Sequence, residues 1–229
     1  MSRPFEVKIP LEQSHLRSVL FAVELFDAVT LSRISQGVKV IAEGLQGAPI
    51  VNVSGYFVWQ KEDIGPLRGV SIDPGILPYE SVTVSVDKLR IPPVAPPLTT
   101  IELPPRVDYA FAAGTTGVRG TLIEERVVPP VPVKEAEVRL EWLDEDGVTW
   151  HDAPTHSHTN VDGDFVSILR LGSTEVPRLD ASGAFTVRLH AKRSAVSERH
   201  SVDLKILQGR VADPSTLNAL TFAWDEMQP

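Results

Sequence analysis

The sequence Asn-Val-Ser-Gly-Tyr-Phe-Val at residues 52–58 returns as Asn-Val-Asp-Gly-Asp-Phe-Val at residues 160–166, 108 residues later. Five of the seven positions are identical, and the spacing is close to half of the 229-residue chain. A turn followed by an aromatic strand that recurs at this distance indicates an internal duplication. In each copy glycine permits a tight turn, asparagine caps it, and the aromatic residue enters a core. We therefore predict turn and core roles for Asn52, Gly55, Phe57, Asn160, Gly163 and Phe165.

Short runs of alternating apolar and polar residues, separated by 19 prolines and 15 glycines, indicate an all-β chain. The clearest runs are residues 38–42, 82–86, 99–103, 116–123, 136–142, 185–191 and 202–206. In the run 136–142 we expect Glu137, Arg139 and Glu141 to face water. Residues 16–25 fit both a helical stripe and a strand, and their Phe, Val and Leu content favours the strand.

Proline and glycine also divide the chain. Residues 91–97, Ile-Pro-Pro-Val-Ala-Pro-Pro, cannot donate a regular ladder of hydrogen bonds and should be extended. The composition changes between Pro104 and Gly114, before the next strand begins. We therefore predict two domains, residues 1–107 and residues 113–229.

The order of a Val-x-Val or Ala-x-Val strand, a loop and then Asn-x-[Ser/Asp]-Gly-x-Phe resembles the carboxypeptidase regulatory-like, or transthyretin-like, β-sandwich family. Gly55 and Gly163 match the turn of that family, and Phe57 and Phe165 match its core aromatic residue. The resemblance implies an all-β fold of two tandem transthyretin-like or Ig-like antiparallel β-sandwiches. Members of the family are mostly accessory, adhesive or structural modules. Tandem copies look like those of phage-tail-like contractile particles, also called contractile injection systems.

The bulk composition excludes several classes of function. With 22 Lys and Arg against 30 Asp and Glu the net charge is -8, so we expect no nucleic-acid binding. The absence of cysteine rules out disulfides and thiolate metal ligands. The apolar stretch from Val19 to Phe26 is broken by Glu24 and is too short to cross a bilayer, so we expect no membrane insertion.

Glu6 lies where a signal peptide would need its apolar core. We therefore expect a cytoplasmic protein. A particle that is assembled in the cytosol and later released would reconcile this location with the external roles that tandem sandwiches usually have.

The sharpest candidate site is the segment 151–158, His-Asp-Ala-Pro-Thr-His-Ser-His, which we expect to be a loop that is longer than its counterpart in the first domain. His156 and His158 alternate, so both can project to one side and form a two-histidine chelate, completed by His151 or Asp152. The alternative is a solvated polar loop without a ligand. His151, His156 and His158 are thus weak metal candidates.

Four tryptophans raise a carbohydrate-stacking hypothesis. Trp59 and Trp142 are in phase with core residues, so we expect both to be buried. Trp150 is less constrained, and so are Phe222 and Trp224 in the tail, so these three are candidates for an interface. The tail from Val211 to Pro229 either closes the second sandwich, which we favour, or extends to a neighbouring subunit.

A catalytic constellation is missing from the sequence. There is no Gly-x-Ser-x-Gly elbow, phosphate loop or His-Glu-x-x-His helix, and the chain lacks the Tyr-Arg-Gly-Ser tail of the transthyretin-related hydrolases. The acidic residues 144–146 surround a hairpin turn and are expected to be solvated. We assign no catalytic residue and no cofactor.

These observations give one leading function and two alternatives. The leading hypothesis is a non-enzymatic structural or adaptor protein in a larger assembly, such as a phage-tail-like contractile particle. Its partners would be other protein subunits, and a homo-oligomer is also open. The first alternative is an adhesion or carbohydrate-binding module that uses Trp150 and the histidine-bearing segment 151–158. The second is a metal-dependent enzyme at the segment 151–158.

Overall fold

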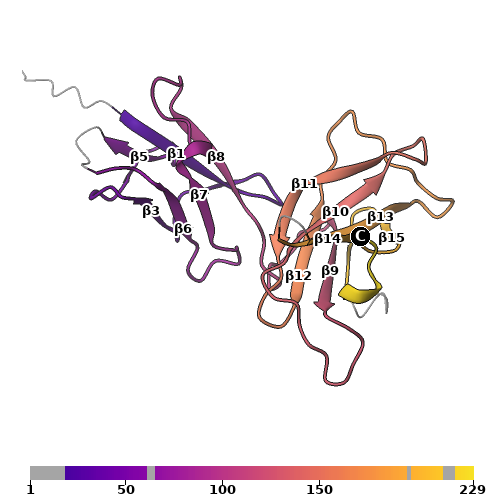
Figure 1. Cartoon of the computed structure of the whole chain (residues 1–229). Helices are drawn as coiled ribbons and strands as arrows, with labels where there is room; N and C mark the ends of the chain where they lie inside the picture. The colour runs from indigo at the N-terminus through magenta and orange to yellow at the C-terminus, as the bar shows by residue number, and fades with distance from the viewer. Residues whose placement is uncertain (1–18, 61–64, 195–196, 214–219) are drawn as a thin grey trace, which may run out of the picture.

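The computed structural model describes residues 19–60, 65–194, 197–213 and 220–229. These residues form β-strands and two short 3₁₀ turns, with no α-helix among them (Figure 1), so the all-β prediction is confirmed. Within the same ranges no helix is long and apolar enough to cross a membrane. We refer below to residues 19–107 as the N-terminal half and to residues 113–229 as the C-terminal half.

In the N-terminal half, β1 is the central strand. The elements are β1 (Val19–Asp27), β2 (Arg33–Ile34), β3 (Lys39–Glu43), β4 (Ile50–Val51), β5 (Phe57–Gln60), β6 (Gly69–Asp73), β7 (Val82–Ser85), η1 (Val86–Lys88) and β8 (Leu98–Leu103). β1 pairs antiparallel with β2 and β5 and parallel with β8, and β5 also pairs with β4. A second sheet has the order β3-β6-β7.

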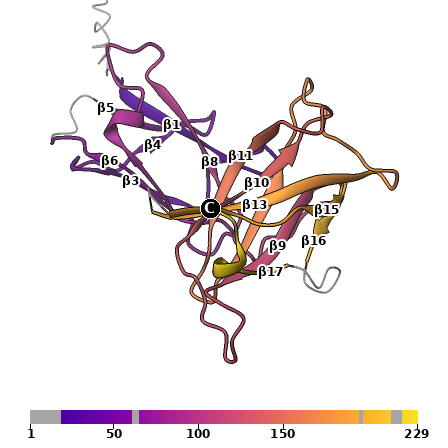
Figure 2. The ribbon, with the colours of Figure 1, turned by 45° about the vertical axis from the view of Figure 1, so that its right-hand side comes forward.

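In the C-terminal half, β9 has the corresponding central place. The elements are β9 (Thr116–Ile123), β10 (Glu137–Leu143), β11 (Trp150–His158), β12 (Asp164–Leu169), β13 (Ala184–Ser194), β14 (Ser197–His200), β15 (Leu204–Leu207), β16 (Val211–Ala212), β17 (Thr221–Ala223) and η2 (Trp224–Glu226). β9 pairs antiparallel with β12 and parallel with β16 and β17 (Figure 2). A second sheet has the order β11-β10-β13, and β13 also pairs with β14 and β15.

Each half has its own hydrophobic core. The buried clusters draw on residues 21–103 and residues 118–227, and in each cluster both sheets contribute inward-facing side chains. Phe21 and Trp59 stack in the first cluster with ring centroids 4.6 Å apart, and Phe165 meets Phe222 in the second at 5.8 Å. This packing of facing sheets is consistent with a β-sandwich.

The strand predictions are largely confirmed. The ambiguous residues 16–25 contain the strand β1 from Val19 onward, and residues 16–18 lie outside the described residues. The run 202–206 becomes a strand only at Leu204. The segment 151–158 was wrongly expected to be a loop, because it forms β11 along β10. Hydrogen bonding to β10 imposes a strand on a histidine- and proline-containing sequence of weak β-propensity.

The repeated phrase forms the same turn in both places. Asn52 Oδ1 accepts hydrogen bonds from the N–H groups of Ser54 and Tyr56 at 3.0 and 2.9 Å, and the N–H of Gly55 bonds to the carbonyl of Asn52. In the second copy Asn160 makes the same three contacts with residues 162, 164 and 163. The glycine φ is +79° in both copies.

The structure contains a third copy of this turn, at residues 180–185, that was not predicted from the sequence. Asp180 Oδ1 accepts from the N–H groups of Ser182 and Ala184 at 2.8 and 3.0 Å, Gly183 has a φ of +76°, and Phe185 follows in the core. The signal was present as Asp-x-Ser-Gly-x-Phe, since an aspartate oxygen caps the turn as an asparagine oxygen does. The phrase therefore marks the start of a core strand, and two of its three copies lie in the C-terminal half.

We predict that replacing glycine by alanine distinguishes two copies of the turn. Gly163→Ala would place a Cβ 2.4 Å from the carbonyl oxygen of Leu122, whereas Gly183→Ala meets nothing within 4 Å. Both changes cost the left-handed backbone strain of about 1–2 kcal/mol, and only Gly163→Ala adds a clash with backbone. Urea unfolding of the two variants should show the larger loss of unfolding free energy for Gly163→Ala. Equal losses would contradict the close approach to Leu122.

Candidate functional site

The histidine-bearing segment lies on β11, at the edge of the sheet β11-β10-β13. Its side chains alternate, with Ala153, Thr155 and Ser157 buried, and with His156 and His158 exposed on the other face. The hydroxyl of Thr155 donates to the carbonyl of Ile168 at 3.0 Å, and that of Ser157 donates to the carbonyl of Val166. Because both carbonyls belong to β12, these hydroxyls join the two sheets along this edge.

The three candidate histidines have different partners. His151 stacks on Trp142 with centroids 4.5 Å apart, and its Nε2 lies 3.1 Å from Asp144. His158 contacts Glu80, whereas His156 lies opposite Arg139 in the strand register. The part of the chain that the structure describes holds no group of three His, Asp or Glu side chains arranged for a metal ion. The geometry therefore gives the metal hypothesis no support.

The outward face of the sheet beside β11 holds a network of charged side chains. Glu141, expected to face water, is 6% exposed, because the longer side chains beside it cover its carboxylate. It accepts hydrogen bonds from Arg188 Nε at 2.5 Å and from His200 Nδ1 at 3.1 Å. Burial raises the pKa of Glu141, but the bond and the charge of Arg188 outweigh it, so the pKa lies below its usual value. The structure thus corrects the predicted exposure of Glu141.

The tryptophan candidates have close neighbours as well. The guanidinium of Arg188 lies 4.3 Å from the ring centroid of Trp150, so one face of this indole is covered by a cation–π contact. Trp224 is 7% exposed, and Arg193 and Arg199 both lie over its ring. Phe222 is 5% exposed, and β17 pairs with β9. The tail thus completes the sheet of its own half, as expected, and Trp59 and Trp142 are buried, also as expected.

A junction between the halves brings together residues that the sequence did not single out as a site. Its centre is Asp27, at the end of β1 and 3% exposed. One carboxylate oxygen accepts from the N–H groups of Val29 and Thr30, and the other from the hydroxyls of Tyr79 and Tyr109 at 3.2 and 2.5 Å. Burial, together with the charge and bonds of Asp27, raises the pKa of Tyr79 to about 12 and that of Tyr109 as well. Both phenols therefore remain protonated donors at neutral pH.

Two ion pairs cross the junction in addition to the contacts of Asp27. Arg170 follows β12 and donates to the carbonyl of Ala28 and to both carboxylate oxygens of Glu102, each at 3.1 Å. Glu80 accepts from the backbone N–H of His158 at 2.9 Å and lies 3.0 Å from His158 Nδ1. Beside this second pair is a cleft of about 550 Å³ lined by both halves, with Arg106, Asp108, His158 and Asn160 in its wall.

The segment from Pro104 to Gly114, which connects the two halves, is itself held in place by hydrogen bonds. The backbone N–H of Arg106 donates to the carbonyl of Pro78, and the N–H of Glu80 donates to the carbonyl of Pro104. These bonds tie the connecting segment to the loop before β7. The guanidinium of Arg119 donates to the carbonyl of Tyr109 and lies 5.0 Å over the ring of Phe111, which ties it to β9. Segments on both sides of the predicted boundary are therefore anchored, and side-chain contacts join the two halves.

Comparison with known proteins gives only distant structural matches. No family model matches the chain, and neither does any curated protein. Among solved structures, the shaft pilin SpaA from Lactobacillus rhamnosus GG matches at 8% identity, covering 86% of this chain and 96% of that one, with a TM-score of 0.24. A mutant of the same pilin matches at 7% identity with a TM-score of 0.25. At such TM-scores the likeness carries no argument about function.

We predict that the His158–Glu80 contact weakens as the pH rises. The hydrogen bond and charge of Glu80 raise the pKa of His158, assisted by the charges of Glu137 and Glu135, and outweigh its partial burial. A raised folded-state pKa means that the stabilisation is fully present below about pH 6.5 and is lost as the pH rises through the raised value. Because His158 is half exposed, the effect should stay below about 1 kcal/mol.

An NMR titration measures this directly. In the Glu80→Gln variant the pKa of His158 should fall, because the hydrogen bond and the charge that raise it are lost. A His158 pKa that is the same in both proteins would disprove the ion pair across the junction.

Proposed function

We propose that this chain is a non-enzymatic structural or adaptor protein made of two tandem transthyretin-like β-sandwich domains, residues 1–107 and 113–229. Its task would be to hold other subunits of a larger assembly in a fixed geometry. The observation that carries the proposal is the junction, in which Asp27, Arg170 and Glu80 each make several contacts with groups from other parts of the chain. Domains joined only by a linker move relative to one another by default, and multiple contacts oppose that motion.

The recurrence of strand pairing supports the tandem arrangement. In each half the strand after the repeated phrase pairs antiparallel with the first long strand, and the last strand pairs with it in parallel. In each half a second sheet also contains an antiparallel pair built from the Val-x-Val or Ala-x-Val strand, β3 with β6 and β10 with β13, and β10 pairs in addition with β11. Such shared strand pairings are what a duplicated domain would retain after its sequence has diverged.

A larger assembly would suit a rigid protein of two domains whose sequence shows no catalytic constellation. The sequence resemblance points to a phage-tail-like contractile particle, and assembly in the cytosol followed by release would suit this chain. The partners would be other protein subunits of that particle. The exposed edges of β3 and β7, with apolar and polar side chains in alternation, offer backbone groups for such contacts.

We predict that the native protein sediments with a high-molecular-weight complex. A gradient of a native extract, probed with an antibody to the chain, should place it in fractions far heavier than its 25.1 kDa. Recovery only as the free protein, in an extract that is shown to contain intact particles, would contradict the proposal.

Rigid placement can be measured separately by electron spin resonance. The chain has no cysteine, so spin labels at Val53→Cys and Val148→Cys, at exposed positions in the two halves, have no background. We expect a narrow distance distribution that becomes broad when Arg170→Ala and Glu80→Ala are combined. The control Arg126→Ala removes an exposed ion pair within the C-terminal half and should leave the distribution narrow. A broad distribution in the parent protein would rule out a rigid spacer.

A further inference from the structure

A small apolar groove opens on the side of the C-terminal half that faces away from the junction. The sheet order β12-β9-β17 puts β12 and Arg170 next to the N-terminal half and β17 on the opposite edge. Within the described residues β17 has β9 as its ladder partner, and on its other edge the carbonyl of Thr221 accepts a hydrogen bond from Arg126 Nη2 at 2.9 Å. Thr221, Phe222 and Ala223 of β17 line the groove.

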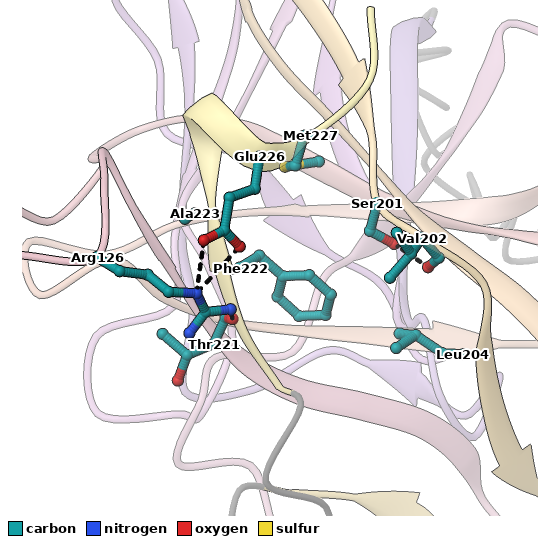
Figure 3. A pocket seen from close by; sticks show the side chains of 9 residues that line it. All are labelled: Arg126, Ser201, Val202, Leu204, Thr221, Phe222, Ala223, Glu226 and Met227. Atoms are coloured by element: carbon teal, nitrogen blue, oxygen red, sulfur yellow. Dashed lines mark hydrogen bonds and ion pairs between the residues drawn. The ribbon is translucent and has the colours of Figure 1, made fainter.

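The groove has an apolar floor and a charged rim. Figure 3 shows Phe222 between the Arg126–Glu226 pair on one side and the segment from Ser201 to Leu204 on the other. Phe222, Leu204 and Met227 form the floor, and Val202 stands at the mouth with 67% of its surface exposed. The Arg126–Glu226 pair lies at 2.9 Å, with more than half of each side chain exposed.

The volume of the groove indicates the size of an occupant. It measures about 150 Å³. A dry apolar cavity of about this volume accepts one benzene molecule, so the groove has room for one phenylalanine ring. An occupant must therefore present a single aromatic side chain, and a strand beside it can pair with the backbone groups on this edge of β17 that Arg126 does not hold.

The sequence of the chain before β1 has these properties. Residues 4–11 lie outside the described residues and read Pro-Phe-Glu-Val-Lys-Ile-Pro-Leu, with Phe5, Val7, Ile9 and Leu11 in strict alternation. Phe5 is the one aromatic residue among residues 1–18. On the polar positions, Glu6 and Lys8 complement Arg126 and Glu226 of the rim in charge. An alternating sequence of this kind is typical of a strand with one apolar face.

The distance between the start of β1 and the groove favours a second copy of the chain as the source of residues 4–11. β1 ends at the junction, where Asp27 and Ala28 make their contacts, and its nine residues span about 30 Å. Its beginning is thus at the far end of the N-terminal half (Figure 1), whereas the groove is on the far side of the C-terminal half. Residues 5–19, fully extended, reach at most about 50 Å, most of which the return along β1 would use.

We propose that residues 4–11 of one copy add a strand to β17 of a second copy, with Phe5 in the groove beside Phe222 and Val202. The contact is head to tail, so it does not close on itself in a dimer and can continue along a row of subunits. This inference rests on the proposed function, because it names a second copy of the chain as one partner in the assembly.

Two variants test the two sides of the contact by sedimentation velocity over a range of concentrations. We expect the parent chain to self-associate, and Phe5→Ser and Val202→Asp each to weaken association by about tenfold or more through the loss of one buried apolar contact. Val161→Asp, at a position of similar exposure (69%) in the same half, is the matched control and should associate like the parent. Unchanged thermal unfolding of each variant shows that it is folded.

Mixing the two variants gives the decisive result. Phe5→Ser keeps the groove and Val202→Asp keeps the segment, so at a concentration at which each variant alone is monomeric the mixture should form a dimer and nothing larger. Association that depends on Val202 and not on Phe5 would assign the groove to another occupant and overturn the proposal. A parent chain that is monomeric at all concentrations also overturns it, and if that chain still sediments with a large particle, the proposed function stands.

Discussion

The buried carboxylate of Asp27 is the constraint on which the arrangement of the chain depends. A charge that is taken from water costs several kcal/mol unless hydrogen bonds replace its hydration, so the four donors around Asp27 are required as a set. Two are backbone N–H groups that shape the end of β1, and two are the hydroxyls of Tyr79 and Tyr109. Satisfying one side chain therefore fixes the turn after β1, the loop that holds Tyr79 and the connection between the halves.

The ion pairs of the junction have a different role from that of Asp27. Arg170 and His158 belong to the C-terminal half and reach Ala28, Glu102 and Glu80 of the N-terminal half. Their side chains are partly exposed, so each pair adds little stability, but together they define one orientation. The buried hydrogen bonds of Asp27 hold the connecting segment in place, and the exposed ion pairs favour one orientation of the two halves. The proposed task of positioning other subunits would require both.

The capped turn explains what the repeated phrase does. A side-chain oxygen of Asn or Asp accepts two backbone N–H groups, and glycine takes the positive φ that follows. This geometry needs only residues within the phrase, and for that reason it could be predicted from the sequence. The third copy at Asp180 shows that the same local device starts a core strand wherever it occurs. The predicted duplication has better support in the strand pairing than in the phrase. β1 and β9 each pair antiparallel with the strand after the phrase and parallel with the last strand of their half.

Alternation of apolar residues and the turn residues were sufficient to predict an all-β chain, most of its strands and the burial of Phe57, Phe165, Trp59 and Trp142, because these properties depend on neighbours in the chain. The same reasoning failed for β11, whose strand is imposed by β10, and for Glu141, whose burial depends on side chains from β13 and β14. The contacts of the junction could not be predicted from these sequence patterns either. Tyr109 and Asp27 are 82 residues apart, and Arg170 and Ala28 are 142 apart. No periodic pattern encodes which distant polar groups meet. The sequence alone determined the strands and their buried faces, and only the tertiary structure decided how the two halves are joined, since that depends on where folded sheets bring single polar side chains together.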